Sequence, residues 1–235
     1  MTEVIAARNI VKTYGKGENA FSALKGVDLS INEGEVVAVV GKSGSGKSTL
    51  MHLLALLDTP TTGAVVLGGT NASELQRKKV DKLRNEEFGF VFQQFFLNGD
   101  ESVLNNVILP LKIAGVSSRV RKQKGLEVLK AVELEDKANS KANDLSGGQK
   151  QRVCIARALI NNPKIIFADE PTGNLDSQTG QKIEDLLFEL NRKKGITLIF
   201  VTHDEDLAKR CTRQVHIKDG KIVSGAKSVR KVGVR

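Results

Sequence analysis

Short, unbroken apolar runs recur along the chain and alternate with helical patterns. Four such runs occur, at Val36–Val40, Phe88–Phe92, Ile165–Ala168 and Leu198–Val201. Runs of this length, rich in β-branched residues, are typical of strands that are buried on both faces of a parallel sheet. Helical patterns follow at Thr49–Leu57 and at Gln181–Lys193. This alternation predicts an α/β fold with right-handed crossovers between parallel strands.

Two regions depart from this alternation. Residues 1–35 and 63–70 combine glycine turns with a period of two, which predicts a small N-terminal antiparallel β subdomain. Residues 95–145 look helical throughout, and Ser117–Glu133 is rich in Lys, Arg and Leu. We therefore expect a helical subdomain, roughly residues 95–160, inserted in the α/β core of a single domain that covers residues 1–235.

The composition narrows the class of protein. Hydrophobic residues make up 40% and charged residues 27%, as in ordinary globular proteins. No apolar run approaches the roughly 18 residues that span a bilayer, and the N-terminus lacks the pattern of a secretory signal, so we expect a cytoplasmic protein. The net charge is +9, but one Tyr and no Trp supply little surface for base stacking, so no nucleic-acid partner is expected. The basic tail, residues 225–235, reads either as a solvated terminus or as a contact for a lipid surface.

The segment Gly41–Ser48 reads GKSGSGKS and fits the phosphate-loop pattern G-x-x-x-x-G-K-[ST] at every position. It directly follows the expected strand Val36–Val40 and opens a helix, which is the context that this motif requires. Glycines let backbone N–H groups approach a phosphate closely, and the helix N-terminus adds partial positive charge. Lys47 can reach the β- and γ-phosphates, and the Ser48 hydroxyl can ligate Mg²⁺.

Polar side chains stand where other expected strands end. The segment KIIFADE places Asp169 and Glu170 at the tip of a buried strand, where ligands of parallel sheets bind. Asp169 is suited to hold Mg²⁺ through water, and Glu170 to polarise an attacking water. Gln93 follows the strand Phe88–Phe92 and could reach Mg²⁺ or that water. His203 follows the strand Leu198–Val201, which we expect beside the strand that carries Asp169, so a contact to the γ-phosphate is favoured.

Leu145–Gln149 reads LSGGQ and is expected to form a turn that enters a helix. Gly147 and Gly148 allow an anion to approach, and the Ser146 hydroxyl can donate to a phosphate oxygen. Because the chain already contains one phosphate loop, a second phosphate-reading turn is most economically explained if it reads the phosphate that another subunit holds.

Taken in this order, these motifs resemble those of the nucleotide-binding subunit of ABC transporters, and the resemblance spans Tyr14 to about Gly220. GKSGSGKS matches Walker A, Gln93 the Q-loop, LSGGQ the signature, IIFADE Walker B and His203 the switch histidine. NLD at Asn174–Asp176 resembles the D-loop, which in this family crosses the dimer interface. The resemblance implies a P-loop NTPase core that uses ATP and Mg²⁺, with the single tyrosine, Tyr14, stacked on the adenine.

The site residues that we predict fall into four groups. The catalytic residues are Glu170, His203, Lys47 and Gln93, and the metal ligands are Ser48, Gln93 and Asp169. ATP is expected to contact Tyr14, Gly41, Lys42, Ser43, Gly44, Ser45, Gly46, Lys47, Ser48, Thr49, Gln93, Asp169 and His203. A second copy of the chain would complete the site in trans with Ser146, Gly147, Gly148 and Gln149, and Asp176 would lie at the dimer interface.

Three further segments narrow the resemblance to the lipoprotein-release and macrolide-export group (LolD- and MacB-type), with FtsE a near relative. They are Phe88–Leu97, Asn106–Gly115 and Asp169–Gly180. The resemblance implies an integral membrane permease subunit as partner, of the four-helix MacB/LolC-like kind, and a place on the inner face of the cell membrane. The chain departs from the group at Asn98–Ser102 (NGDES), near the partner-contact region.

We therefore predict the ATP-binding subunit of an ABC-type export or mechanotransmission complex, which hydrolyses ATP in a head-to-tail dimer. The alternative is a soluble ABC ATPase of an iron–sulfur type assembly system, with the same motifs and no membrane partner. The sequence leaves the cargo open among peptides, drugs, lipoproteins and the activation of a cell-wall hydrolase. One complete set of motifs favours a dimer of two copies of this chain.

Overall fold

In the computed structural model, which describes residues 2–223, strand β3 (Val36–Val40) is paired on both sides with parallel strands. These strands are β8 (Thr197–Thr202) and β9 (Arg213–Lys218). Four of the five residues of β3 are buried, which explains why its sequence, VVAVV, has no polar face. Strand β10 (Lys221–Val223) extends the sheet by pairing antiparallel with β9. The predicted strands at 36–40 and 198–201 are confirmed.

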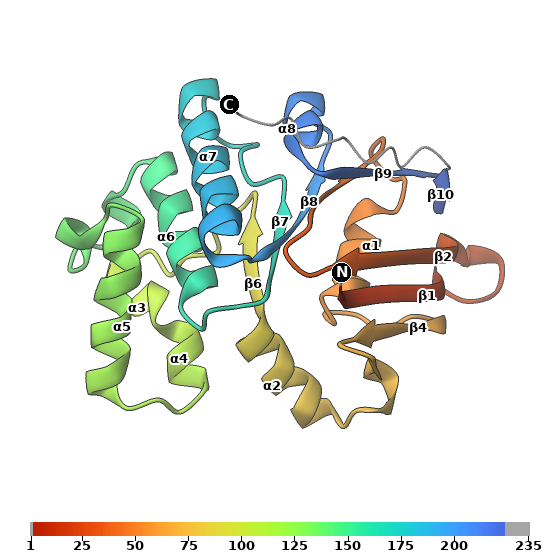
Figure 1. Ribbon diagram of the computed structural model, residues 1–235, viewed down its shortest axis with the longest axis horizontal. Coiled ribbons are helices and arrows are strands. Elements are labelled where there is room, and N and C mark those ends of the chain that lie inside the picture. The colour runs from red at the N-terminus through yellow and green to blue at the C-terminus, as the bar shows by residue number, and fades with distance from the viewer. Residues whose placement is uncertain (1, 224–235) are drawn as a thin grey trace. The chain divides into compact units, whose positions relative to one another are not determined.

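The chain divides into two compact units, one of residues 2–81 and 197–223 and the other of Lys82–Ile196. The first unit also contains a four-stranded sheet in the order β2-β1-β4-β5, of which Figure 1 shows β2, β1 and β4 side by side. Its strands are β1 (Glu3–Tyr14), β2 (Phe21–Asn32), β4 (Thr62–Leu67) and β5 (Thr70–Asn71). All neighbouring pairs in it are antiparallel, as the sequence predicted.

Helix α1 (Lys47–Leu54) contacts strands of both sheets of the first unit and buries four side chains, Leu50, Met51, Leu53 and Leu54. It begins and ends earlier than the predicted Thr49–Leu57. It begins at Lys47 because Gly46 takes a positive φ of 106° in front of it, and the chain leaves the helix at Leu56, where φ is 55°. Helix α8 (Glu205–Arg210) contacts β3 and β8, and the boundary between the two units falls within helix α2 (Arg77–Glu87).

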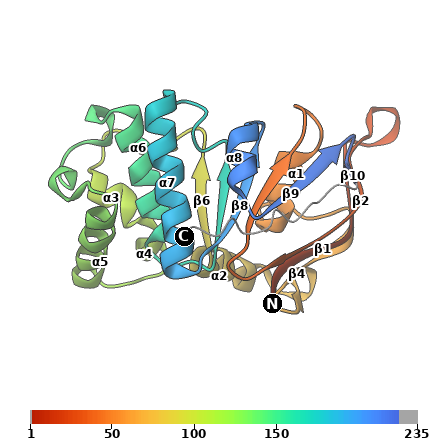
Figure 2. The ribbon, with the colours of Figure 1, turned by 45° about the horizontal axis from the view of Figure 1, so that its top comes forward.

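In the second unit, β6 (Phe88–Phe92) pairs in parallel with β7 (Ile165–Asp169), at the predicted positions. The rings of Phe90 and Phe167 stack across this pair, with their centroids 5.7 Å apart. Helix α6 (Gly147–Leu159) contacts β6 and also α7 (Ser177–Lys194), and Figures 1 and 2 both show α6 beside α7. The α/β class, with its parallel pairs and separate antiparallel sheet, is confirmed.

Residues 95–145 are not continuously helical, contrary to our expectation. The α-helices there are α3 (Val103–Val107), α4 (Leu109–Ile113) and α5 (Ser118–Ala131). Two short 3-10 helices follow at Glu135–Lys137 and Ala142–Asp144, and residues 93–102 contain no helix. The buried Asn106 side chain accounts for the irregular segment, because it accepts from the backbone N–H of Asn98 and donates to the carbonyls of Asn98 and Ser102. The limits of the helical subdomain (95–160) and of the single domain (1–235) stay predictions. The basic tail, 225–235, lies outside the described residues.

Candidate functional site

The loop between β3 and α1 leads into a helix whose first backbone N–H groups have no carbonyl partner within the helix. A Cβ atom at Gly41 would lie 2.3 Å from the carbonyl oxygen of Ile217, so no side chain fits there. Helix α1 has no side-chain cap, and its first i→i−4 hydrogen bond runs from Leu50 N to Gly46 O. The N–H groups of the three preceding helical residues, 47–49, therefore lack a carbonyl partner within the helix. This arrangement suits an anion with several oxygens.

Two side chains of the loop add to this arrangement. The Lys47 ammonium donates to the carbonyl oxygens of Gly41 and Lys42, at 2.8 and 3.1 Å, so it lies over the loop that its own helix closes. The Ser45 hydroxyl is buried and has no hydrogen-bond partner within the described part of the chain. A buried hydroxyl without a partner is costly, and a phosphate oxygen would satisfy it.

His203 lies beside this loop in the first unit. Strand β8 pairs with β3 in register, with Thr202 opposite Val40. His203 and Gly41 therefore leave the sheet at the same edge, on adjacent strands. His203 is exposed at that edge. Within this unit, the pairing of β8 with β3 therefore places His203 next to the start of the phosphate loop.

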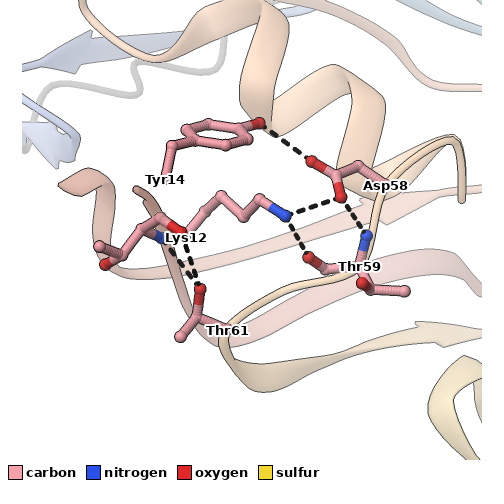
Figure 3. A network of polar contacts seen from close by, with 6 residues as sticks. Lys12, Tyr14, Asp58, Thr59 and Thr61 are labelled. Atoms are coloured by element: carbon pink, nitrogen blue, oxygen red, sulfur yellow. Dashed lines mark hydrogen bonds and ion pairs between the residues drawn. The ribbon is translucent and has the colours of Figure 1, made fainter. Parts of the chain in front are cut away.

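Tyr14 ends β1 and keeps 42% of its surface exposed. Its hydroxyl donates to Oδ2 of Asp58 at 3.0 Å (Figure 3). Burial raises the pKa of Tyr14 above its ordinary value, and the hydrogen bond to the Asp58 carboxylate acts in the same direction. An exposed ring with a fixed hydroxyl is available for stacking, and the stacking on adenine stays a prediction. Asp58 is a partner that the sequence did not reveal.

In the second unit, Phe92 is paired with Asp169, so Gln93 and Glu170 follow adjacent strands at one edge. Asp169 is the last residue of β7, so three predicted residues, Gln93, Asp169 and Glu170, lie at this edge. Glu170 has a positive φ of 45°, which is uncommon for a residue with a side chain. Strained backbone of this kind is often found at functional sites, where the surrounding structure holds it in place.

Two residues outside the predicted site set, Gln151 and Asn174 of the D-loop segment, support this edge. The Gln151 side chain, on α6, is fully buried, and its Nε2 donates to the carbonyl oxygens of Phe92 and Pro171 at 3.3 and 2.5 Å. Its amide thus joins the backbone just before Gln93 to the backbone just after Glu170. Asn174 donates to the carbonyl oxygen of Gln93 at 2.8 Å. Spacing alone gave no signal for Gln151, which lies two residues beyond LSGGQ.

The LSGGQ segment forms the expected turn into helix α6. Ser146 caps the helix, and the cap is reciprocal: Gln149 N donates to Ser146 Oγ, and Ser146 N donates to Gln149 Oε1. Since Ser146 Oγ acts here as an acceptor, its own hydrogen stays outside the cap and can be directed at an anion. Asp176 similarly caps α7 by accepting from Thr179 N at 3.0 Å, and the hydrogen bonds from Thr179 lower the pKa of Asp176.

The residues fit the groups that the motifs imply. The loop offers N–H groups, an ammonium and the unsatisfied Ser45 hydroxyl, which suit the phosphates of a nucleotide. The predicted metal ligands offer a hydroxyl, an amide oxygen and a carboxylate, from Ser48, Gln93 and Asp169. Such hard oxygen donors suit Mg²⁺. Among the described residues no compact group of three His, Cys, Asp or Glu side chains forms a separate metal site.

The family model described as "ABC transporter" matches residues 24–173, more than half of the chain. The chain belongs to the ABC transporter family. It is 46% identical over 223 residues to the lipoprotein-releasing system ATP-binding protein LolD of Syntrophus aciditrophicus, covering 95% of this chain and 100% of the relative. It is 49% identical over 223 residues to the uncharacterized ABC transporter ATP-binding protein MJ0796 of Methanocaldococcus jannaschii, covering 93% of this chain and 95% of the relative.

Solved structures agree with this assignment. The dimeric, post-hydrolysis structure of the ATP-binding cassette MJ0796 bound to ADP and Pi matches with a TM-score of 0.87 at 46% identity. It covers 96% of this chain and 99% of that one. The predicted ABC ATPase fold and ATP-binding function are therefore confirmed, and the comparisons give no support to the iron–sulfur assembly alternative. Within residues 2–223, none of the helices combines the length and apolar character that crossing a bilayer requires.

Proposed function

We propose that this chain is the ATP-hydrolysing subunit of an ABC-type export or mechanotransmission complex of the LolD/MacB kind. The observation that carries the proposal is the 46% identity to a lipoprotein-releasing LolD protein over the whole length of that relative. The family assignment alone does not say which kind of transport system the chain serves, so the similarity over the full length of LolD is what supports this narrower class.

Each predicted side chain has a role in hydrolysis that its chemistry supports. The loop N–H groups and the Lys47 ammonium bind the phosphates, and Tyr14 stacks on the adenine. Glu170 polarises the attacking water, and His203 contacts the γ-phosphate. Charge spreads over the γ-phosphoryl oxygens in the transition state, so cationic and N–H groups that are already in position lower the barrier.

Mg²⁺ would be held by Ser48, Gln93 and Asp169. When bound, it neutralises charge on the phosphate oxygens. Asn174 donates a hydrogen bond to the backbone carbonyl of Gln93. The Gln151 amide donates to the carbonyls of Phe92, just before Gln93, and of Pro171, just after Glu170. These bonds support a fixed placement of the backbone that carries the two side chains.

Two copies of the chain are proposed to close head-to-tail over two ATP molecules. The dimeric structures of MJ0796, one of them bound to ADP and Pi, support a dimer of this chain. In each site the second copy would supply Ser146–Gln149, and the outward hydrogen of Ser146 suits this role. Asp176, in the turn that precedes α7, would lie at the dimer interface. Hydrolysis would remove the γ-phosphate that both copies share, and the dimer would open.

The membrane partner is proposed to be an integral permease of the four-helix MacB/LolC-like kind. The segment near Phe95–Gly115 would contact it, which would place the chain in the cytoplasm on the inner face of the membrane. Three large apolar side chains in this segment support the proposal because they are exposed: Phe96 at 65%, Leu109 at 45% and Ile113 at 71%. The Arg157 guanidinium, which donates to the carbonyl oxygens of Phe95 and Phe96, supports a fixed place for the first of them.

The test uses Glu170→Gln, with Glu189→Gln on the exposed face of α7 as the matched control. The first variant should bind ATP, lose steady-state hydrolysis and elute as a dimer on size exclusion with ATP and Mg²⁺. The control should hydrolyse ATP like the wild type. A Glu170→Gln chain that turns over ATP at the wild-type rate would remove Glu170 from its role.

The same variant tests the partner. A tagged Glu170→Gln chain is purified with ATP from detergent-solubilised membranes of the native host, and mass spectrometry identifies what accompanies it. A stoichiometric integral membrane protein would support the transporter proposal, and its outer domain would point to the cargo. If only soluble proteins accompany a folded, ATP-bound chain, the assembly-ATPase alternative replaces it.

A further inference from the structure

Tyr14 belongs to a polar network that lies entirely in the first unit (Figure 3). Its hydroxyl donates to Oδ2 of Asp58 at 3.0 Å. The other carboxylate oxygen, Oδ1, accepts from Lys12 Nζ and from the backbone N–H of Thr59, both at 2.7 Å. Lys12 Nζ also donates to the carbonyl oxygen of Thr59 at 2.7 Å. Both oxygens of the carboxylate are therefore engaged, and its plane is fixed.

The ion pair between Lys12 and Asp58 is better shielded from solvent than the ion pair between Arg8 and Glu3, which both lie on β1. The side chains of Lys12 and Asp58 are 11% and 31% exposed, whereas those of Arg8 and Glu3 are 51% and 33% exposed. Salt screens a partly buried pair less than an exposed one. Hydrogen bonds from Lys12, Thr59 and Tyr14 outweigh the cost of burial and lower the pKa of Asp58, so the carboxylate stays charged at neutral pH.

The network also covers one face of the Tyr14 ring. Lys12 Nζ lies 4.9 Å from the ring centroid, within the range of a cation–π contact. The ring is thus restrained in two ways, by its hydroxyl at one end and by the ammonium over one face. A planar ligand would then find the ring already oriented. Binding to a side chain that is already held costs less conformational entropy than binding to a free one.

We propose that Asp58 and Lys12 are positioning residues that hold the Tyr14 ring ready to stack on the nucleobase of ATP. The inference rests on the proposed ATP binding and deepens the role of Tyr14 in it. Asp58 and Lys12 act through Tyr14, so their contribution is confined to the base and does not extend to the phosphates. The structure thereby gives the base and the phosphates separate binding elements, which can be tested separately.

The experiment compares a ligand with a base and a ligand without one. Dissociation constants are measured by calorimetry, with Mg²⁺, for ATP and for inorganic tripolyphosphate. Asp58→Ala and Lys12→Met should each weaken ATP binding about fivefold, the size of a typical aromatic stacking contribution, and leave tripolyphosphate binding unchanged. The matched control, Glu3→Ala, removes the ion pair with Arg8 on the same strand and should change neither.

A second variant and a spectroscopic measurement distinguish the loss of ring positioning from the loss of the fold. Tyr14→Phe keeps the ring and the ion pair and removes only the hydroxyl, so it should weaken ATP binding, and adding Asp58→Ala to it should cost less than Asp58→Ala alone costs. Tyr14 is the only tyrosine and the chain has no tryptophan, so the fluorescence anisotropy of the free protein reports on this ring alone. Asp58→Ala should increase its fast, nanosecond depolarisation.

The outcomes separate the two proposals. Equal weakening of ATP and tripolyphosphate by Asp58→Ala, or unchanged ATP affinity, would overturn the positioning role. If Tyr14→Ala weakens ATP binding selectively but Asp58→Ala does not, stacking stands and positioning fails. If Tyr14→Ala binds ATP like the wild type, stacking and positioning both fail. The proposed ATPase function is judged independently, by steady-state hydrolysis in the wild-type chain.

Discussion

Gln93 and Asn174 are joined by two reciprocal hydrogen bonds: Asn174 Nδ2 donates to the Gln93 carbonyl oxygen at 2.8 Å, and Gln93 Nε2 donates to Asn174 Oδ1 at 3.4 Å. The two residues are 81 positions apart in the sequence. The contact ties the residue that we predict as a metal ligand to the turn that follows Glu170. A substitution in this turn should therefore affect the reaction through Gln93, without replacing any of the predicted catalytic residues.

Gly173→Ala tests this coupling. A Cβ atom at Gly173 would lie 2.8 Å from Gln93 Nε2, the end of a flexible side chain, so Gln93 should move aside while the fold remains. We expect kcat for ATP hydrolysis to fall about tenfold, because small displacements of a positioned group are costly. Gly180→Ala is the control, since its Cβ would make ordinary contact with Thr172 at 3.4 Å or more. Wild-type kcat in Gly173→Ala would contradict the coupling.

Lys47→Ala should weaken ATP binding about tenfold or more, the usual size of a charge-assisted hydrogen bond. The reason is the loss of the ammonium that lies over the carbonyls of the phosphate loop. Calorimetry with ATP and with tripolyphosphate should give similar losses, because the lysine acts on phosphates. Lys194→Ala, at the end of α7, is the control. Unchanged ATP affinity in Lys47→Ala would count against the phosphate-binding role.

Gln151→Met should lower the free energy of unfolding by about 1–3 kcal/mol, because it leaves the Phe92 and Pro171 carbonyl oxygens without their donor. Methionine preserves most of the volume, so the loss is assigned to the hydrogen bonds. Urea denaturation followed by circular dichroism measures it. Gln123→Met, at an exposed position on α5, should change stability little. Equal stability of the Gln151 variant and the wild type would show that the amide carries no net stabilisation.

The Tyr14 hydroxyl should titrate above its ordinary pKa of 10.0, since burial and the hydrogen bond to Asp58 both raise the pKa, and a hydrogen bond with Thr49 opposes them only in part. A raised pKa means that the folded state favours the protonated phenol. Its stabilisation is therefore complete below pH 10 and is lost as the pH rises through the folded-state pKa. Absorbance at the phenolate band follows the single tyrosine, and Asp58→Ala should shift the midpoint downward. A midpoint that does not move would exclude the bond to Asp58 as a cause.

Local sequence patterns were sufficient for the elements whose apolar runs have no polar face. Val36–Val40 and Phe88–Phe92 were predicted with the observed limits, because strands buried on both faces leave a continuous apolar signature. The phosphate loop and the LSGGQ turn were also found, since both are defined by contiguous residues. Their predicted roles toward ATP stay predictions.

What the sequence did not reveal depends on contacts between distant residues. Asp58 gave no signal, because its relation to Tyr14 arises only when β1 comes to lie beside the end of α1, 44 residues later. Gln151 looks like any polar residue on a helix until its burial between two carbonyls is known. The irregular segment before α3 was taken as helical because the Asn106 bonds that hold it are local in space but not periodic in sequence.

Both neighbours of strand β3 come from the C-terminal part of the described chain, since β8 and β9 begin at Thr197 and Arg213. The turn after β9 reaches the phosphate loop as well: Gly220 N donates to the Ser45 carbonyl at 3.0 Å, and Lys25 N donates to the Gly220 carbonyl at 2.8 Å. A fragment trimmed to the family match at 24–173 would carry every residue of Walker A and expose both edges of the strand beneath it. Such a fragment should aggregate, so the smallest piece that can bind ATP is defined by the sheet and not by the motifs.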